Sequence, residues 1–257
     1  MNGKLTETNL LLPMRESKPR ESGITVLIDN GAPFESLKAT VDNAGEYIDF
    51  IKFGWGTSLL SKKLPEKINY LIRNEIDYFF GGTLFEKFLS QRKVEAFYDH
   101  CRNFNCNYVE ISNGTLAIPN HQKAEYIREF SRDFSVFSEV GTKDSSEALK
   151  EDSKEWLTNI HEDIEAGAAK VITEARESGS GGICGEDGSI RSDIFDEIVA
   201  AGIPMERLIF EAPNKSLQTF FIKQIGPNVN LANVALSDVI SLETLRLGLR
   251  SDTFHLY

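Results

Sequence analysis

Short apolar segments recur along the chain and alternate with longer stretches whose apolar residues are three or four positions apart. The short segments are rich in β-branched and aromatic residues and end at turn residues or charges, which is typical of buried strands. Eight strands are predicted on this basis, at residues 24–28, 48–53, 78–80, 108–111, 136–140, 171–172, 208–210 and 229–234.

The stretches between these segments carry an apolar stripe with helical spacing. After the first strand, Phe34, Leu37, Val41 and Ala44 share one helical face, and similar spacing follows the later strands. Such a stripe packs a helix against a sheet. Eight strand–helix units in 257 residues average about 32 residues each. The alternation implies parallel strands, because each helix returns the chain to the same end of the sheet.

Eight such units close most naturally into a (β/α)₈ TIM barrel of the α/β class. An open doubly wound sheet is the alternative, but it usually carries a glycine-rich phosphate loop after its first strand, and residues 29–33 lack that pattern. No linker rich in Pro, Ser or Gly divides the chain. We therefore predict one catalytic barrel domain over residues 24–257 and an N-terminal arm over residues 1–23 that covers the bottom of the barrel.

Composition is that of an ordinary globular protein and argues against several classes of function. Hydrophobic residues make up 41% and charged residues 26% of the chain, and the net charge is −11. This acidity argues against a broad nucleic-acid surface and against docking on anionic membranes, although a few local basic residues can still bind a small anion. Three cysteines and the lack of a long apolar N-terminal run predict a cytoplasmic protein with reduced thiols.

Ionisable residues gather at the C-terminal ends of the predicted strands. They are Asp29, Lys52, Glu110, Glu139, Glu174 and Glu211. In a barrel these ends open on one face, where barrel enzymes carry their catalytic groups. Five carboxylates around one mouth repel one another, so a divalent cation, lysines or protonation must offset their charge. No histidine falls at a strand end, and an all-oxygen ligand set favours Mg²⁺ over Zn²⁺. The plainer alternative for each residue is a rim position paired with a nearby Lys or Arg.

A glycine-rich segment, residues 174–185, follows the sixth strand. Its backbone N–H groups and Arg176 could bind phosphate or another oxyanion, although a flexible loop would have the same composition. The segment lacks the dinucleotide-binding pattern, because Cys184 stands where the third glycine is needed. Lys215 follows the seventh predicted strand and Asn233 lies in the eighth, at positions where many barrels bind phosphate.

Two lysines are candidates for acid–base chemistry. Lys52 lies in a strand, where burial would lower its pKa, and Lys143 lies on the loop after the fifth strand. A lysine at a strand end could also form a Schiff base with a carbonyl substrate. The residues alone leave both chemistries open.

Segments from most strand ends resemble the phosphosulfolactate synthase family. The likeness runs from residue 18 to residue 254, and together the motifs are highly specific. They are KPRE (18–21), IKFGWGTS (51–58), FGGTLFE (80–86), VEISNGT (109–115), SEVG (138–141), EARESG (174–179), FEAP (210–213), GPNVNL (226–231) and LRLGLR (245–250).

The resemblance implies a barrel lyase that adds sulfite to phosphoenolpyruvate, with Mg²⁺, and forms (2R)-phospho-3-sulfolactate. It also implies a homo-oligomer. We expect Lys143 to be the general acid and Lys52 to neutralise substrate charge, with Asp29 and Glu211 also in the catalytic group. The expected metal ligands are Glu110, Glu139 and Glu174. The expected substrate and phosphate contacts are Arg176, Ser178, Gly179, Lys215 and Asn233.

The chain departs from the family pattern at two positions. Thr142 stands where many members have a second Lys before the one that matches Lys143, and Asn30 stands where Lys often follows the first-strand Asp. Both differences remove positive charge near the mouth and could alter the affinity for sulfite. The family also resembles plant heat-stress proteins. A non-catalytic homologue on the same barrel and a Schiff-base aldolase using Lys52 are therefore the alternatives.

Overall fold

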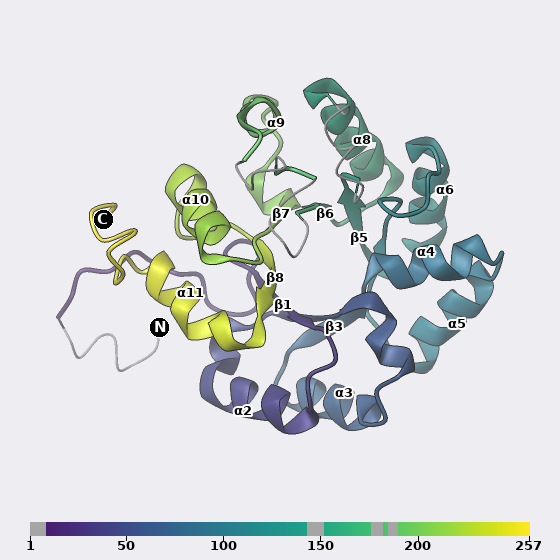
Figure 1. Cartoon of the computed structure of the whole chain (residues 1–257), viewed down its shortest axis with the longest axis horizontal. Coiled ribbons are helices and arrows are strands. Elements are labelled where there is room, and N and C mark those ends of the chain that lie inside the picture. Colours follow the sequence, from purple (N-terminus) through teal and green to yellow (C-terminus); the bar gives the residue numbers. More distant parts are fainter. Residues whose placement is uncertain (1–8, 143–151, 176–181, 185–189) are drawn as a thin grey trace.

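A computed structural model describes residues 9–142, 152–175, 182–184 and 190–257 (Figure 1). Its strands are β1 (Thr25–Asp29), β2 (Phe50–Phe53), β3 (Asp77–Phe80), β4 (Tyr108–Ile111), β5 (Ser135–Val140), β6 (Lys170–Thr173), β7 (Leu208–Glu211) and β8 (Leu231–Ala235). Its α-helices are α2 (Phe34–Ala44), α3 (Leu64–Arg73), α4 (Gly82–Ser90), α5 (Val94–Asn103), α6 (Asn120–Phe130), α8 (Ser153–Ala166), α9 (Ser192–Ala200), α10 (Lys215–Ile225) and α11 (Val239–Arg246).

The strands form one parallel sheet that curves into a ring. Their hydrogen-bonded order is β3-β2-β1-β8-β7-β6-β5-β4, so β3 and β4 stand at its two ends and meet to complete a nearly closed barrel. Figure 1 shows the helices arranged around the outside of this ring. The predicted (β/α)₈ TIM barrel in a single domain is therefore confirmed.

Helix α4 is an element that the apolar spacing did not predict, because Gly81 and Gly82 are typical of a turn. In the structure Gly82 instead begins the helix at a place with no room for a side chain. A Cβ atom on Gly82 would lie 2.3 Å from the Ser112 Oγ and 2.8 Å from the Glu110 Oε1. The glycine therefore marks a close approach between the start of α4 and β4 rather than the end of an element.

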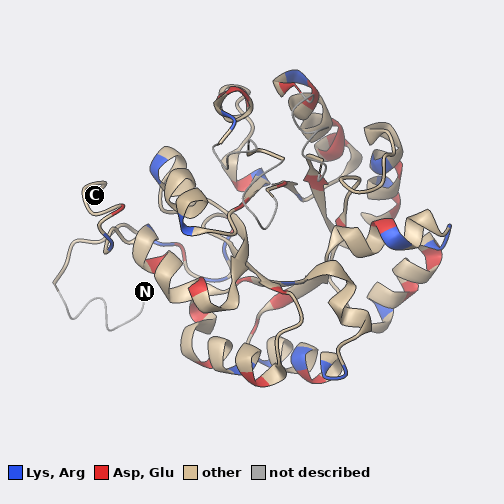
Figure 2. Cartoon of the chain, viewed as in Figure 1, with Lys and Arg blue, Asp and Glu red and all other residues tan. Residues whose placement is uncertain are grey.

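The barrel interior consists of an apolar layer below a charged layer. Side chains alternate between the two faces of a strand, so residues two positions apart share a face. The buried inner cluster contains Ile24, Val26, Phe50, Phe79, Phe137, Ile172, Ile209 and Ala232, with Tyr108 packed against it. Five charged residues each follow a member of this apolar layer by two positions, and they form the charged layer: Lys52, Glu110, Glu139, Glu174 and Glu211. Figure 2 shows acidic segments on the strands around the barrel opening.

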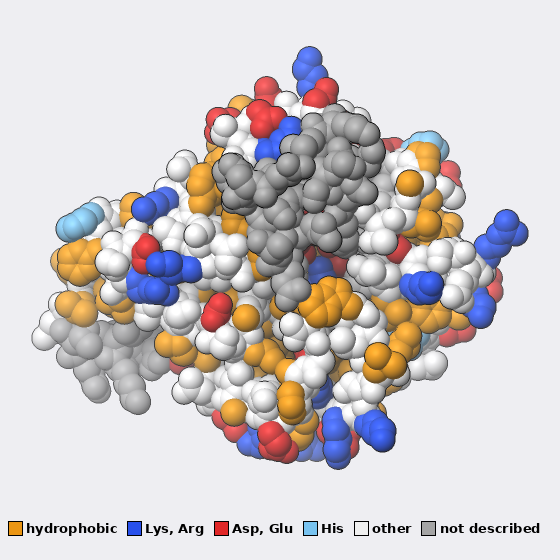
Figure 3. Space-filling model, in the orientation of Figure 1, with side chains coloured by type: hydrophobic (Ala, Val, Ile, Leu, Met, Phe, Trp, Pro, Cys, Tyr) orange, Lys and Arg blue, Asp and Glu red, His pale blue; other side chains and the backbone are white. Residues whose placement is uncertain are grey.

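Outward-facing strand residues and the apolar helix faces form a larger, second core. Leu27 and Ile51 on neighbouring strands belong to it, as do Leu37 and Val41 of α2. On the molecular face seen in Figure 3, basic and acidic side chains are interspersed, with no broad basic surface over the part of the chain that is described. None of the described helices is both long enough and apolar enough to cross a membrane.

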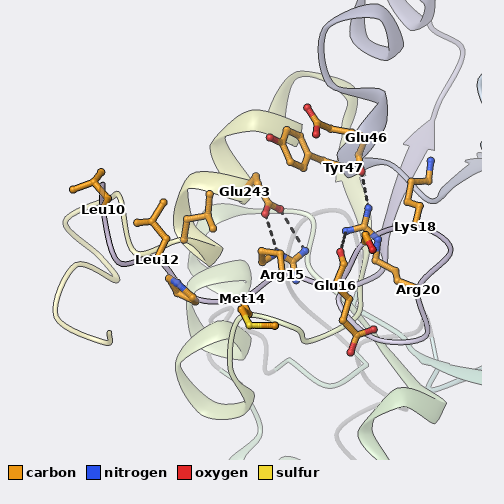
Figure 4. Close-up of a pocket in the computed structure, with 13 residues that line it drawn as sticks. Leu10, Leu12, Met14, Arg15, Glu16, Lys18, Arg20, Glu46, Tyr47 and Glu243 are labelled. Carbon is orange, nitrogen blue, oxygen red and sulfur yellow. Dashed lines mark hydrogen bonds and ion pairs between the residues drawn. The ribbon is translucent and has the colours of Figure 1, made fainter. Parts of the chain in front are cut away.

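Residues 9–23 cross the N-terminal end of the barrel without forming a helix or strand. The Arg15 Nε atom lies 2.8 Å from the Glu243 Oε1 of α11, and the Arg20 Nε lies 2.9 Å from the Asp49 Oδ1 that precedes β2. Between this segment and the barrel is a cavity of about 250 Å³ that is lined in part by Tyr47 (Figure 4). The arm thus covers the end of the barrel opposite to the charged layer.

Gly141, which follows β5, occupies a conformation and a space that exclude other residues. Its φ is +117°, and a Cβ atom would lie 2.8 Å from the Trp156 ring of α8 and 2.9 Å from the Glu174 Cβ. A side chain here would therefore push against both the outer core and a member of the charged layer. Gly226 offers a comparison, because its φ is +116° and no heavy atom lies within 4 Å of its Cβ position.

We predict that Gly141→Ala lowers the free energy of unfolding by about 3 kcal/mol, since overpacking adds to an unfavourable φ. Gly226→Ala should cost less than Gly141→Ala, because it introduces an unfavourable backbone conformation without a clash. Urea unfolding followed by circular dichroism measures both. Equal losses in the two variants would show that the Trp156 contact is not limiting.

Candidate active site

A cavity of about 290 Å³ opens at the C-terminal end of the barrel, directly above the charged layer. Four residues of that layer line it, together with residues of β1 and β8 and of the segments that follow β2, β3, β4 and β7. The lining includes Lys52, Glu139, Glu174, Glu211, Trp55, Thr83, Thr115, Pro213 and Asn233. These four strand-end charges thus converge on one mouth, as the sequence predicted.

Lys52 is the cation at the centre of the charged layer. It is 6% exposed, and its Nζ lies 2.9 Å from the Glu110 Oε2, 3.2 Å from the Glu211 Oε1 and 3.3 Å from the Glu139 Oε2. Burial opposes the charge on Lys52, but attraction to the three carboxylates outweighs it and raises the pKa of Lys52 well above its ordinary value. Lys52 is therefore a fixed ammonium ion, whereas the sequence predicted a lowered pKa.

Glu110 bridges two elements of the barrel. Its Oε1 accepts a hydrogen bond of 2.6 Å from the Gly82 N–H at the start of α4, while its Oε2 pairs with Lys52. Both oxygens are engaged, one with the backbone beside β3 and one inside the barrel. The side chain thus connects β4 to the element that follows β3, the pair of strands where the ladder order ends.

Glu139, Glu174 and Glu211 form a buried group suited to a metal ion. One carboxylate oxygen from each lies within 4.8 Å of the others. With Glu110 and Lys52 the layer carries a net charge of −3 when all five groups are ionised. A divalent cation would offset most of this charge, and an all-oxygen donor set fits Mg²⁺. Two of the three expected ligands belong to this trio, with Glu211 where Glu110 was expected.

The remaining predicted site residues divide into three groups. Asn233 lines the cavity. Lys215 lies on the surface at the start of α10, where its Nζ is 3.1 Å from the Asp252 Oδ1, and it does not line the cavity. Lys143, Arg176, Ser178 and Gly179 lie outside the residues that the structure describes.

Asp29 faces the helix layer rather than the cavity. Its Oδ1 accepts hydrogen bonds from the Gly31 and Ala32 N–H groups at 2.9 and 2.8 Å, and its Oδ2 pairs with Lys67 of α3. Ile28, one position earlier, lines the cavity, so the alternation of the strand directs Asp29 outward. Its contacts make it a residue that shapes the loop after β1.

Two residues near the mouth were missed by the search for charges at strand ends. Glu86 of α4 accepts hydrogen bonds from the Ser112 hydroxyl at 2.6 Å and the Thr115 N–H at 2.8 Å, and so holds the loop after β4 beside the cavity. Trp55, in the 3₁₀ segment η2 (Gly54–Leu59), lines the cavity although it is 52% exposed, and its φ is +51°. Both fall within motifs that carried the resemblance.

We predict that Lys52→Met lowers the free energy of unfolding by about 3–5 kcal/mol near pH 8, because it leaves three buried carboxylates without their cation. The raised pKa means that the native protein loses this stabilisation only above the ordinary lysine pKa of 10.5. In the variant, protonation of the carboxylates relieves their repulsion, so the loss should be smaller at pH 5 than at pH 8.

Lys38→Met is the matched control, because Lys38 forms an exposed ion pair with Asp42 on the surface of α2. This change should leave the free energy of unfolding almost unchanged at both pH values, because an exposed ion pair contributes little to stability. Chemical unfolding at pH 5 and pH 8 measures all three proteins. A Lys52→Met cost no larger than that of the control would contradict the central role of Lys52.

Comparison of the sequence with known proteins shows the family of this chain. The sequence pattern of the (2R)-phospho-3-sulfolactate synthase family (ComA) matches residues 13–252. The chain is 58% identical over 252 residues to the phosphosulfolactate synthase of Bacillus subtilis (strain 168), covering 98% of this chain and 100% of that relative. It is 25% identical over 262 residues to Protein HEAT-STRESS-ASSOCIATED 32 of Arabidopsis thaliana, covering 90% and 88% of the two chains.

Among solved structures, phosphonopyruvate hydrolase in complex with oxalate and Mg²⁺ superposes with a TM-score of 0.55 at 12% identity, over 85% of this chain and 77% of that one. At this identity the likeness supports the barrel fold alone. The family match spans nearly the whole described barrel, and the identity to the bacterial relative extends over its full length. This chain therefore belongs to the (2R)-phospho-3-sulfolactate synthase family.

Proposed function

We propose that this protein adds sulfite to the methylene carbon of phosphoenolpyruvate and forms (2R)-phospho-3-sulfolactate. The observation that carries the proposal is the buried layer of four carboxylates and one lysine at the mouth, in which three carboxylates contact Lys52 and all members but Glu110 line a cavity of about 290 Å³. Such a layer would hold a divalent cation, and the chain that carries it belongs to a family named for this product.

Glu139, Glu174 and Glu211 would hold the Mg²⁺ ion. When bound, the ion would stabilise the negative charge that moves onto the substrate carboxylate as the carbon–sulfur bond forms. Glu110 is less suited to the metal, because it belongs neither to the carboxylate trio nor to the residues that line the cavity. We therefore propose Glu211 in place of Glu110 as the third carboxylate ligand.

Lys52 would act as a fixed positive charge. Its three carboxylate contacts hold the ammonium ion in one place and keep it protonated. Because the cavity wall includes Lys52, the ammonium can offset part of the charge of an anionic substrate without moving. Glu139 and Glu211 each contact Lys52 and also belong to the trio that would hold the cation, so they couple the ammonium to the cation site.

The proton donor would be Lys143, which the sequence places shortly after β5. Sulfite attack on the methylene carbon leaves the adjacent carbon to be protonated, and a lysine delivering that proton from one side would fix the configuration of the product. Arg176, Ser178 and Gly179 would bind the phosphate. These four residues lie outside the described part of the chain, and their roles rest on sequence position and family resemblance.

The alternatives receive less support from the geometry. A Schiff-base aldolase needs a neutral lysine amine, whereas three carboxylates keep Lys52 charged. A non-catalytic homologue of the plant heat-stress type would gain nothing from burying four carboxylates around one lysine, because burial of charge is costly. Surface pairing with Asp252 gives Lys215 no evident part in phosphate binding.

We predict that protein mixed with phosphoenolpyruvate, sulfite and Mg²⁺ forms phosphosulfolactate, detected by ³¹P NMR and mass spectrometry. Omitting any component, or adding a chelator, should abolish the product. Glu174→Gln should lower kcat at least 100-fold by weakening the cation site, whereas Glu165→Gln, an exposed change on α8, should have no effect. Product formation that is unaffected by chelator would contradict the metal requirement.

Lys143→Ala should abolish turnover and leave the affinity for phosphoenolpyruvate within a few-fold of the native value, because the proton donor acts after binding. Lys154→Ala, an exposed change on α8, is the control and should retain full activity. Steady-state assays and equilibrium binding of phosphoenolpyruvate measure the two effects. Near-normal turnover by Lys143→Ala would rule out this assignment.

A further inference from the structure

Strand β8 contains an irregularity beside the cavity. In its pairing with β1, Thr25 lies opposite Leu231 and Leu27 lies opposite Val234, so three steps along β8 match two steps along β1. The extra residue belongs to a β-bulge. Within it, Asn233 has a φ of +56°, a left-handed conformation that costs most residues about 1–2 kcal/mol and that Asn tolerates better than most.

The bulge changes the direction of one side chain. Leu231 belongs to the outer core and Ala232 to the inner cluster, so regular alternation would direct residue 233 outward. Instead Asn233 lines the mouth cavity, and Val234 returns to the outer core. The irregularity therefore brings a polar side chain to the cavity while leaving the packing of its neighbours intact.

The amide oxygen of Asn233 has no partner among the residues that the structure describes. Its Oδ1 atom is buried and accepts no hydrogen bond from any described residue. A buried acceptor left unpaired costs about 1–3 kcal/mol, so the site combines an unsatisfied oxygen with an unfavourable φ. Two such costs at one residue are expected where a ligand completes the site.

The surroundings of this oxygen indicate the chemistry of its partner. Ala232, the preceding residue, pairs with Glu211 of β7, which belongs to the carboxylate trio, and all three members of that trio line the same cavity. An acceptor oxygen next to carboxylates attracts a cation or a donor bound to a cation. A neutral amide oxygen would also add a ligand without adding to the net charge of −3.

We infer that the Asn233 Oδ1 is a neutral oxygen of the divalent-cation site, bound to the cation itself or to a water that the cation carries. The inference rests on the proposed function, because it assumes the cation at Glu139, Glu174 and Glu211. The bulge on β8 would then place this oxygen beside the three carboxylates before the cation binds.

Direct cation binding tests the inference without reference to turnover. Mn²⁺ is the probe, because it shares the oxygen ligands of Mg²⁺ and its binding is followed by electron paramagnetic resonance or calorimetry. Asn233→Gly removes the side chain and suits a positive φ, so the metal-free variant should be as stable as the native protein. Its Mn²⁺ affinity should fall at least 10-fold.

Asn233→Asp separates a cation contact from a substrate contact. Aspartate tolerates the same φ but has only acceptor oxygens, so it keeps a ligand for a cation and cannot donate to an anionic substrate. Its Mn²⁺ affinity should be native or tighter. The control is Asn105→Gly, at an exposed residue with a φ of +52°, which should leave Mn²⁺ affinity unchanged.

Native Mn²⁺ affinity in Asn233→Gly, or loss of binding in Asn233→Asp, would overturn the inference. Activity of the native protein separates this failure from that of the proposed function. If the native protein forms phosphosulfolactate and the Asn233→Gly variant binds Mn²⁺ with native affinity, the proposed function stands and the role of Asn233 is refuted. Failure of the native protein to bind Mn²⁺ refutes both the cation site and the role of Asn233.

Discussion

The charge balance around Lys52 is the interaction on which the site depends. One ammonium ion inside the barrel contacts Glu110, Glu139 and Glu211, at 2.9, 3.3 and 3.2 Å. Neither the lysine nor the carboxylates could be buried here alone, because each unpaired charge would cost several kcal/mol. Among the described residues this layer has four carboxylates and one lysine, and the excess of negative charge makes the mouth attractive to a cation. The same electrostatics therefore stabilise the barrel and prepare its proposed chemistry.

Much of the architecture could be predicted from the sequence, because it follows from repetition. Short apolar segments alternating with helical stripes predicted the parallel barrel, and charges after those segments predicted the mouth. What could not be predicted is which way each charge points. Asp29 and Lys52 both lie at strand ends, yet one is directed to Lys67 on α3 and the other into the cavity. A shift of one residue along a strand exchanges its two faces, and the apolar runs were too short to fix that register.

The arrangement of carboxylates around the ring was equally out of reach of sequence reasoning. Glu110, Glu139 and Glu174 lie on or directly after successive strands, which made them the natural ligand set. The structure instead groups Glu211 with Glu139 and Glu174, while the Glu110 Oε1 accepts a hydrogen bond from the Gly82 N–H at the place where β3 meets β4. Asn233 is the opposite case: it was expected to contact substrate at the mouth and it lines the cavity, but the bulge that turns it inward leaves no mark in the apolar pattern.

The junction between β3 and β4 shows how structure and proposed chemistry share residues. The ladder order ends at these two strands, and side chains connect them instead: Glu110 accepts from Gly82, and Glu86 accepts from Ser112 and Thr115. Glu110 thereby anchors both the barrel wall and one side of Lys52. Glu211 has a comparable pair of contacts, with Lys52 and with the Ala175 N–H at 2.9 Å, but it belongs to the carboxylate trio and lines the cavity, whereas Glu110 does neither. Glu110 thus serves the closure of the barrel between β3 and β4, and the proposed cation site lies at β5, β6 and β7, which backbone ladders join.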